Sequence, residues 1–155
     1  MSEGYSGTPL LARLGYRDGQ QALLVGLPGD LAPALLRPAF AGCHRLAAGD
    51  PLPPGLPPLD LAHLFVAERA VLERWVGVLR PALAPAGMLW VSWPKKAARV
   101  PTDITEDTVR AVALPTGLVD VKVCAVDAVW SGLKLVLRKE LRPPTPRSLR
   151  LAARG

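Results

Sequence analysis

The sequence is poor in several features, and each shortage excludes a class of protein. Two cysteines, Cys43 and Cys124, in 155 residues are too few for a disulfide-built scaffold and fit a reducing compartment. The longest apolar runs, such as 21–26 and 88–93, are too short to cross a bilayer. The first residues have neither the basic nor the apolar segment of a secretory signal. We therefore expect a cytoplasmic protein with no membrane partner.

Net positive charge is nearly absent from most of the chain and is concentrated at its end. Residues 1–137 contain 13 basic and 12 acidic side chains, whereas the last 18 residues contain six basic and one acidic. We expect one domain over residues 1–140, followed by a basic, proline- and arginine-rich tail over 141–155. A solvated tail is the ordinary interpretation. The alternative is a tail that attracts nucleic acid.

Hydrophobic periodicity predicts alternating strands and helices. Strands are expected at 21–26, 43–47, 59–66 and 88–93, and helices at 8–14, 30–39, 67–83 and 103–114. Residues 48–58 carry five prolines and two glycines and predict a stiff loop. Residues 119–125 and 133–137 alternate apolar with polar side chains, which predicts a terminal antiparallel hairpin. The whole favours one α/β domain with a mostly parallel Rossmann-like sheet and helices on both faces.

Three segments carry a resemblance to the class I methyltransferase fold. They are the glycine loop at 23–29, the strand at 59–65 and the turn Leu83-Ala-Pro-Ala-Gly-Met-Leu-Trp-Val91. That turn is similar to the L-x-P-G-G-x-L turn of the superfamily, whose last two strands also form a hairpin. The motifs at 4–10, 93–96, 102–107, 114–127 and 130–134 also resemble a bacterial family catalogued as a domain of unknown function. That resemblance implies the fold and no established activity.

A methyl donor such as S-adenosylmethionine requires glycines after the first strand and an acid after the second. Gly26 and Gly29 are the candidate glycines, and Asp50 is the one plausible ribose ligand. The 33 residues at 26–58 include the 11-residue proline loop, so only one helix and one strand of ordinary length fit there. The usual second helix and third strand should be missing. We therefore expect a truncated scaffold without a cofactor, and keep S-adenosylmethionine as the alternative.

A cationic segment follows the strand at 88–93. Lys95, Lys96 and Arg99 leave the carboxyl end of this strand, where ligands of open α/β sheets bind. Trp93 could stack on a ligand ring, and the helix start near Thr105 could help to hold an anion. The competing interpretation is that the three cations are solvated and Trp93 belongs to the core.

The terminal hairpin gathers a second set of polar and aromatic side chains. Lys122, Asp127, Trp130 and Lys134 could form a surface for a protein partner. Cross-strand charge pairing is the ordinary explanation for such residues.

Two further clusters have ordinary explanations. Asp103, Glu106 and Asp107 cluster at a capping-box-like helix start, where a favourable interaction with the helix dipole explains them. Metal binding or general-acid chemistry is the alternative. Cys43, His44, His63 and Cys124 lack metal-ligand spacing, so no metal is expected. No nucleophile-elbow or phosphate-loop motif is present.

The sequence favours a non-enzymatic or weakly ligand-binding module on a degenerate methyltransferase-like scaffold. Its expected partner is an anionic small molecule or a protein. A methyltransferase with a rebuilt pocket and a nucleic-acid-binding accessory protein are the alternatives.

Overall fold

The computed structural model describes residues 9–142, so the predicted tail beyond Arg142 and the motif at 4–8 lie outside the described residues. The strands are β1 (Gln21–Val25), β2 (Gly42–Leu46), β3 (Leu59–Phe65), β4 (Leu83–Pro94), β5 (Leu118–Ala125) and β6 (Trp130–Leu137). The α-helices are α1 (Leu10–Leu14), α2 (Ala32–Leu35), α3 (Arg69–Leu79) and α4 (Glu106–Ala113). Short 3₁₀ turns occupy Arg80–Ala82, Lys96–Ala98, Leu114–Thr116 and Lys139–Leu141.

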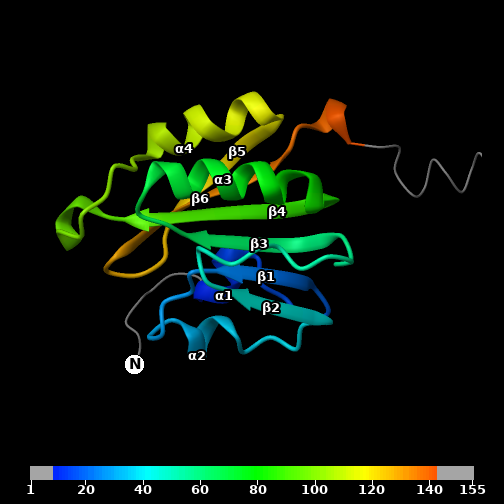
Figure 1. The fold of residues 1–155 in the computed structure, drawn as a ribbon. Helices are drawn as coiled ribbons and strands as arrows, with labels where there is room; N and C mark the ends of the chain where they lie inside the picture. Colours follow the sequence, from blue (N-terminus) through cyan, green and yellow to red (C-terminus); the bar gives the residue numbers. More distant parts are fainter. Residues whose placement is uncertain (1–8, 143–155) are drawn as a thin grey trace, which may run out of the picture.

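The strands form one mixed sheet in the order β2-β1-β3-β4-β6-β5 (Figure 1). The strands β2, β1, β3 and β4 are parallel, and β6 and β5 add an antiparallel hairpin beside β4. The predicted fold class is therefore confirmed. Between β1 and β3 the chain forms only the four-residue helix α2 and the edge strand β2, as the shortage of residues predicts.

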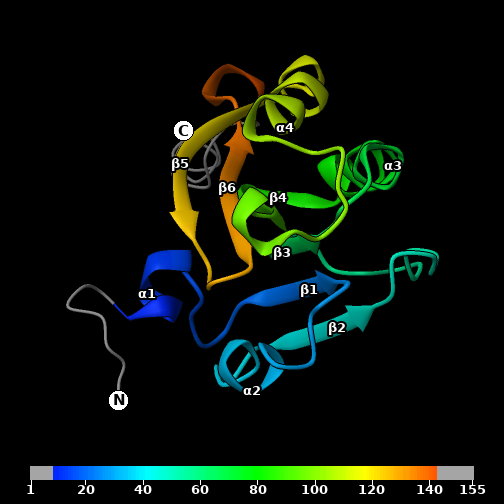
Figure 2. The same cartoon turned by 90° about the vertical axis from the view of Figure 1, so that its left-hand side faces the viewer.

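Helices cover both faces of the sheet. On one face, Trp75 of α3 and Val109 of α4 join a buried cluster with Leu89 of β4. On the other, Leu14 of α1 and Leu35 of α2 pack into a second cluster, and Figure 2 shows these helix pairs on opposite sides. The longest helix between residues 9 and 142 is α3, with 11 residues, and no helix of this part is long and apolar enough to span a bilayer.

Several element boundaries differ from the sequence-based expectations. The helix expected at 30–39 is only α2, without a side-chain cap from Asp30, because Pro33 and Pro38 restrict it from both ends. The helix expected at 67–83 ends at Leu79, and the expected turn at 84–87 belongs to β4. The extra residues of β4 are taken up by a register shift in the β3–β4 pairing: Leu59 pairs with Leu83, and Leu61 pairs with Met88.

Residues 119–125 do not alternate regularly as expected, because a β-bulge interrupts β5. The register shifts between Asp120 and Lys122, so Val121 has no partner in β6. Asp120 pairs with Leu135, on the face of the sheet that α3 and α4 cover. After the bulge Lys122 pairs with Lys134, on the opposite face. Asp120 and Lys122 therefore lie on opposite faces of the sheet, whereas regular alternation would place them on the same face.

A buried polar chain lies in the second cluster. The hydroxyl of Tyr16 is 2.7 Å from Nδ1 of His63, and Nε2 of His63 is 2.7 Å from Oγ of Ser92. His63 also stacks on Phe65, with ring centroids 4.2 Å apart. Burial lowers the pKa of His63 to about 3. The imidazole is therefore neutral, donating through one nitrogen and accepting at the other.

Candidate functional site at the carboxyl edge of the sheet

The loop that follows β4 is anchored on both sides. The amide of Lys95 donates to the carbonyl of Val129 at 2.8 Å, which ties the loop to the hairpin. The hydroxyl of Thr102 donates to the carbonyl of Ala67 at 2.6 Å, just before α3. These bonds fix the positions at which the cationic segment begins and ends.

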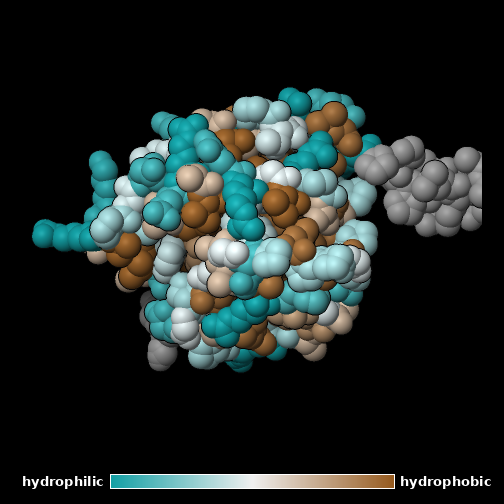
Figure 3. Space-filling view, in the orientation of Figure 1, coloured by the Kyte–Doolittle hydropathy of each residue, from teal (hydrophilic) through white to brown (hydrophobic). Residues whose placement is uncertain are grey.

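A pocket of about 440 Å³ opens between this loop, the start of α4 and the hairpin. Its lining residues are Trp93, Pro94, Lys95, Lys96, Thr102, Ile104, Thr105, Glu106 and Ser131. Neither lysine forms an ion pair with any residue between 9 and 142. Figure 3 shows hydrophilic side chains projecting at the end of the molecule where this loop lies. We call this hollow the edge pocket.

Arg99 is not part of the edge-pocket lining, in contrast to the expected convergence of three cations. It follows the 3₁₀ turn Lys96–Ala98 with φ of 56°, the only positive φ of a non-glycine residue in the range 9–142. A left-handed conformation turns the chain sharply at this point.

The start of α4 borders the edge pocket. Thr105 is the cap: its hydroxyl oxygen accepts from the amide of Thr108, whose side chain in turn accepts from the amide of Thr105. Asp103, the expected start of the capping box, instead accepts from the amide of Arg69 at 2.7 Å. The amides of the first turn carry the positive end of the helix dipole and favour an anion nearby.

Other groups of the edge pocket have defined roles. Trp93 is only 7% exposed and belongs to the core cluster under α3 and α4, so little of its ring is open to stacking. Glu106 is ion-paired with Arg110, which also holds Asp120 at 3.0 Å. The acid of the edge pocket is thus neutralised by its own helix, while the two lysines are not.

The glycines after β1 have distinct environments. Gly26 has φ of +71°, and its amide donates to the carbonyl of Leu46 at 2.8 Å. A Cβ on Gly26 would lie 2.6 Å from the carbonyl oxygen of Phe65. Apart from Gly29 itself and its two chain neighbours, no atom of the described chain lies within 4 Å of a Cβ built on Gly29. Gly26 therefore has a structural reason to be glycine, whereas Gly29 has none in the structure.

Asp50 is engaged in its own turn. Its carboxylate accepts from the amide of Ala47 at 2.7 Å. Arg74 of α3 donates to the carbonyls of Ala48 and Asp50 at 2.8 and 2.9 Å, and the Trp75 indole donates to that of Ala48. These bonds bridge the space between the end of β2 and α3.

Two hollows flank this turn, and Asp50 lines neither of them. One, of about 400 Å³, is lined by Gly26, Leu27, Arg45, Leu46 and Ala47. The other, of about 410 Å³, is lined by Ala48, Gly49, Ala70, Val71 and Arg74. The structure thus does not bring Asp50 and the glycine loop together around one cavity.

The hairpin residues divide into two groups. Asp127 accepts from the amides of Val129 and Trp130 at 2.9 and 2.8 Å and so closes the β5–β6 turn. Trp130 packs its ring edge-on against Phe65, with centroids 5.4 Å apart. Lys122 and Lys134 face each other across the strands, so the expected pairing of opposite charges is absent there.

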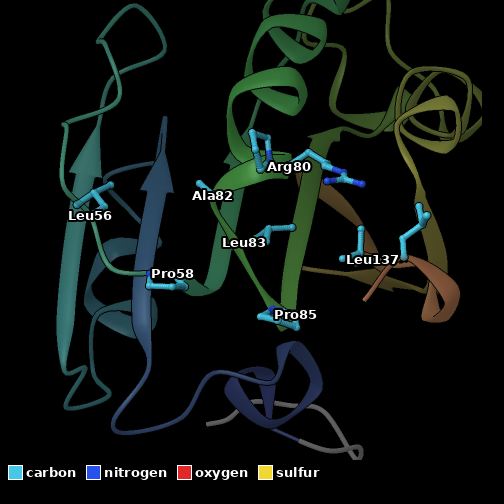
Figure 4. A pocket seen from close by; sticks show the side chains of 9 residues that line it. Leu56, Pro58, Arg80, Ala82, Leu83, Pro85 and Leu137 are labelled. Carbon is cyan, nitrogen blue, oxygen red and sulfur yellow. The ribbon is translucent and has the colours of Figure 1, made fainter. Parts of the chain in front are cut away.

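A pocket of about 430 Å³ lies at the opposite end of the sheet (Figure 4). Its lining residues are Leu56, Pro58, Arg80, Pro81, Ala82, Leu83, Pro85, Leu137 and Leu141. The one cation, Arg80, donates its Nε to the carbonyl of Thr116 at 2.9 Å. A further hollow of about 590 Å³, lined by Lys95, Arg13 and six other residues, lies beside α1. Because all these volumes suit small ligands, volume alone does not select a site.

Metal ligation has no support in the described part of the chain. No group of three or more histidine, cysteine or acidic side chains there could hold an ion. His63, one of the four cysteine and histidine residues considered as metal ligands, has both ring nitrogens in hydrogen bonds with Tyr16 and Ser92.

The fold is similar to those of several solved structures. A SAM-dependent methyltransferase from Aquifex aeolicus superposes with a TM-score of 0.62 at 17% identity, covering 81% of this chain and 86% of that one. A TehB-like SAM-dependent methyltransferase from Corynebacterium glutamicum gives 0.57 at 11%, covering 83% and 85%. Aeropyrum pernix fibrillarin, solved with natively bound S-adenosyl-L-methionine, gives 0.56 at 14%, covering 86% and 70%.

The structural similarity establishes the fold. Identities this low say nothing about the activity. No protein-family model and no curated protein matches the chain, so the resemblance to a bacterial domain of unknown function stays a prediction. The chain is a single small α/β domain with a methyltransferase-like fold, shortened relative to the solved chains.

Proposed function

We propose that this chain is a ligand-binding module that holds a phosphate-bearing small molecule in the edge pocket. The observation that carries the proposal is the pair of lysines, Lys95 and Lys96, which line the edge pocket without an acidic partner between residues 9 and 142. Their position at the carboxyl end of β4 is where open α/β sheets bind ligands. The first turn of α4 adds amide donors on the same side.

The alternative position, next to the glycine loop, offers less to a ligand. Asp50 is bound within its turn, and Arg74 and Trp75 tie that turn to α3. A ribose at Asp50 would have to use the carboxylate oxygen that does not bind Ala47, at a residue that lines neither neighbouring hollow. The edge pocket, by contrast, has both lysines in its lining.

Replacing both edge-pocket lysines should weaken ligand binding strongly. We expect Lys95→Ala with Lys96→Ala to reduce the affinity for pyrophosphate at least about tenfold, because charge-assisted hydrogen bonds contribute about 1.5–3 kcal/mol each. Isothermal titration calorimetry at constant ionic strength measures this. The matched control is Arg138→Ala with Lys139→Ala, which removes two exposed cations at the end of β6. Equal affinities in the two variants would contradict the proposal.

Methyl transfer is the second candidate, and one observation favours it. The fold is that of SAM-dependent methyltransferases, one of them with the donor bound, and a hollow of about 400 Å³ adjoins Gly26. If the binding-module proposal is correct, labelled S-adenosylmethionine should bind no more tightly than millimolar. Micromolar binding in equilibrium dialysis, lost in a Gly29→Val variant that still folds, would favour the transferase instead.

A further inference from the structure

On the face of the terminal hairpin away from α3 and α4, two like charges lie directly opposite each other. Lys122 of β5 and Lys134 of β6 are cross-strand partners, on the face opposite α3 and α4. Directly opposed side chains have Cβ atoms about 5 Å apart, and like charges at that spacing destabilise a sheet. The hairpin therefore carries an electrostatic repulsion that the fold itself does not require.

The bulge at Val121 removes the acid that would have relieved this repulsion. With regular alternation counted back from the Lys122–Lys134 pair, Asp120 would lie on the same face as both lysines. The extra residue turns Asp120 to the opposite face, where it binds Arg110 of α4 at 3.0 Å. Bulges often redirect side chains next to functional sites. Here the redirection leaves the lysine pair uncompensated.

A third cation adds to the same field. Burial lowers the pKa of Lys134, and the charges of Lys122 and Arg17 lower it further. Arg17 follows Tyr16, which packs on this face of the sheet. Within residues 9–142 none of the three cations has an ion-pair partner.

We propose that Lys122 and Lys134 form a second anion site, which binds a phosphate group on the hairpin face away from α3 and α4. Directly opposed lysines, with Cβ atoms about 5 Å apart, can bring both ammonium groups to one tetrahedral oxyanion, and such charge-assisted contacts are strong. Arg17 adds a planar donor group suited to the same chemistry. This site is separate from the edge pocket and does not depend on it.

The test is a chemical-shift titration of the ¹⁵N-labelled full chain with inorganic phosphate, compared with chloride at equal ionic strength. We expect saturable shifts of amides around residues 122 and 134, and at least a tenfold loss of affinity in Lys122→Met with Lys134→Met. This variant should fold, because it removes a repulsion, and its melting temperature in low salt should rise. Arg138→Met with Lys139→Met is the control of equal charge and should bind like the wild type.

Two outcomes would contradict the hairpin site. Equal responses to phosphate and chloride, or unchanged affinity in the double methionine variant, would overturn it. Retention of the shifts near residues 122 and 134 in Lys95→Ala with Lys96→Ala separates this site from the edge pocket. A parallel titration with single-stranded RNA identifies the source of the phosphate: tighter saturable binding of RNA at the same amides indicates a nucleic-acid backbone, and preference for free phosphate indicates a small ligand.

Discussion

Lowering the pH from 7.5 to 5 should reduce the free energy of unfolding by about 2 kcal/mol through His63, and by about 3 kcal/mol at pH 4. In the folded chain burial holds the pKa of His63 at about 3, whereas an imidazole in the unfolded chain titrates near 6.5. The unfolded state therefore binds the extra proton over this interval. The stabilisation is complete above pH 6.5 and is lost as the pH falls toward 3.

Urea unfolding at several pH values measures this dependence, and the two histidines of the chain provide a matched pair. His63→Asn keeps a donor and an acceptor for Tyr16 and Ser92 but does not titrate, so it should flatten the slope between pH 6.5 and 5. His44 lies on the edge strand β2 and is only partly buried. His44→Asn should keep the wild-type slope, and a slope unaffected by His63→Asn would refute the assignment.

Substituting Gly26 by alanine should destabilise the fold by about 3 kcal/mol, from about 1 kcal/mol for the left-handed backbone and about 2 kcal/mol for the steric contact. The contact is with the backbone carbonyl of Phe65, 2.6 Å from the new Cβ. A backbone atom held in the β1–β3–β4 region cannot move aside as a flexible side chain would. The result should be visible in thermal or urea unfolding whether or not a ligand is present.

Gly29 provides the comparison, because the structure gives it neither a positive φ nor a neighbour within 4 Å of a new Cβ. Gly29→Ala should change the free energy of unfolding by less than about 0.5 kcal/mol. If both glycines served only to admit a cofactor, the two alanine variants would be similarly stable. A stable Gly26→Ala protein would therefore contradict the structural role assigned to that glycine.

The layout of the fold could be predicted because its information is local. Runs such as 21–25 and 59–65 are mostly apolar and almost entirely buried, and the pattern at 69–79 is helical. The shortage of chain between β1 and β3 also followed from counting residues. Boundaries were less accessible: the capping residue of α4 is Thr105, because Thr108 can reciprocate its hydrogen bond, whereas Asp103 binds Arg69, 34 positions away in sequence.

The candidate sites depended more on tertiary contacts. The sequence predicted that Lys95 and Lys96 follow the carboxyl end of a strand, as they do in the structure. Nothing in it indicated that Arg99 would adopt a left-handed conformation outside the edge-pocket lining. The bulge at Val121 was also invisible, since the local pattern alternates regularly through it. The partnership of Tyr16, His63 and Ser92 joins three distant segments, and no local pattern could have revealed it.

The hydrogen bonds around the amino end of α3 have a thermodynamic consequence for any molecule that docks at this edge. Thr102 and Asp103 fasten the β4–α4 loop to the start of α3, and Arg74 fastens the β2 turn further along the same helix. The rim is thus preorganised, so association would forfeit little conformational entropy and could proceed close to rigid-body docking. Selectivity at such a rim would come from charge and shape already in place, and would change little with temperature-dependent loop motion.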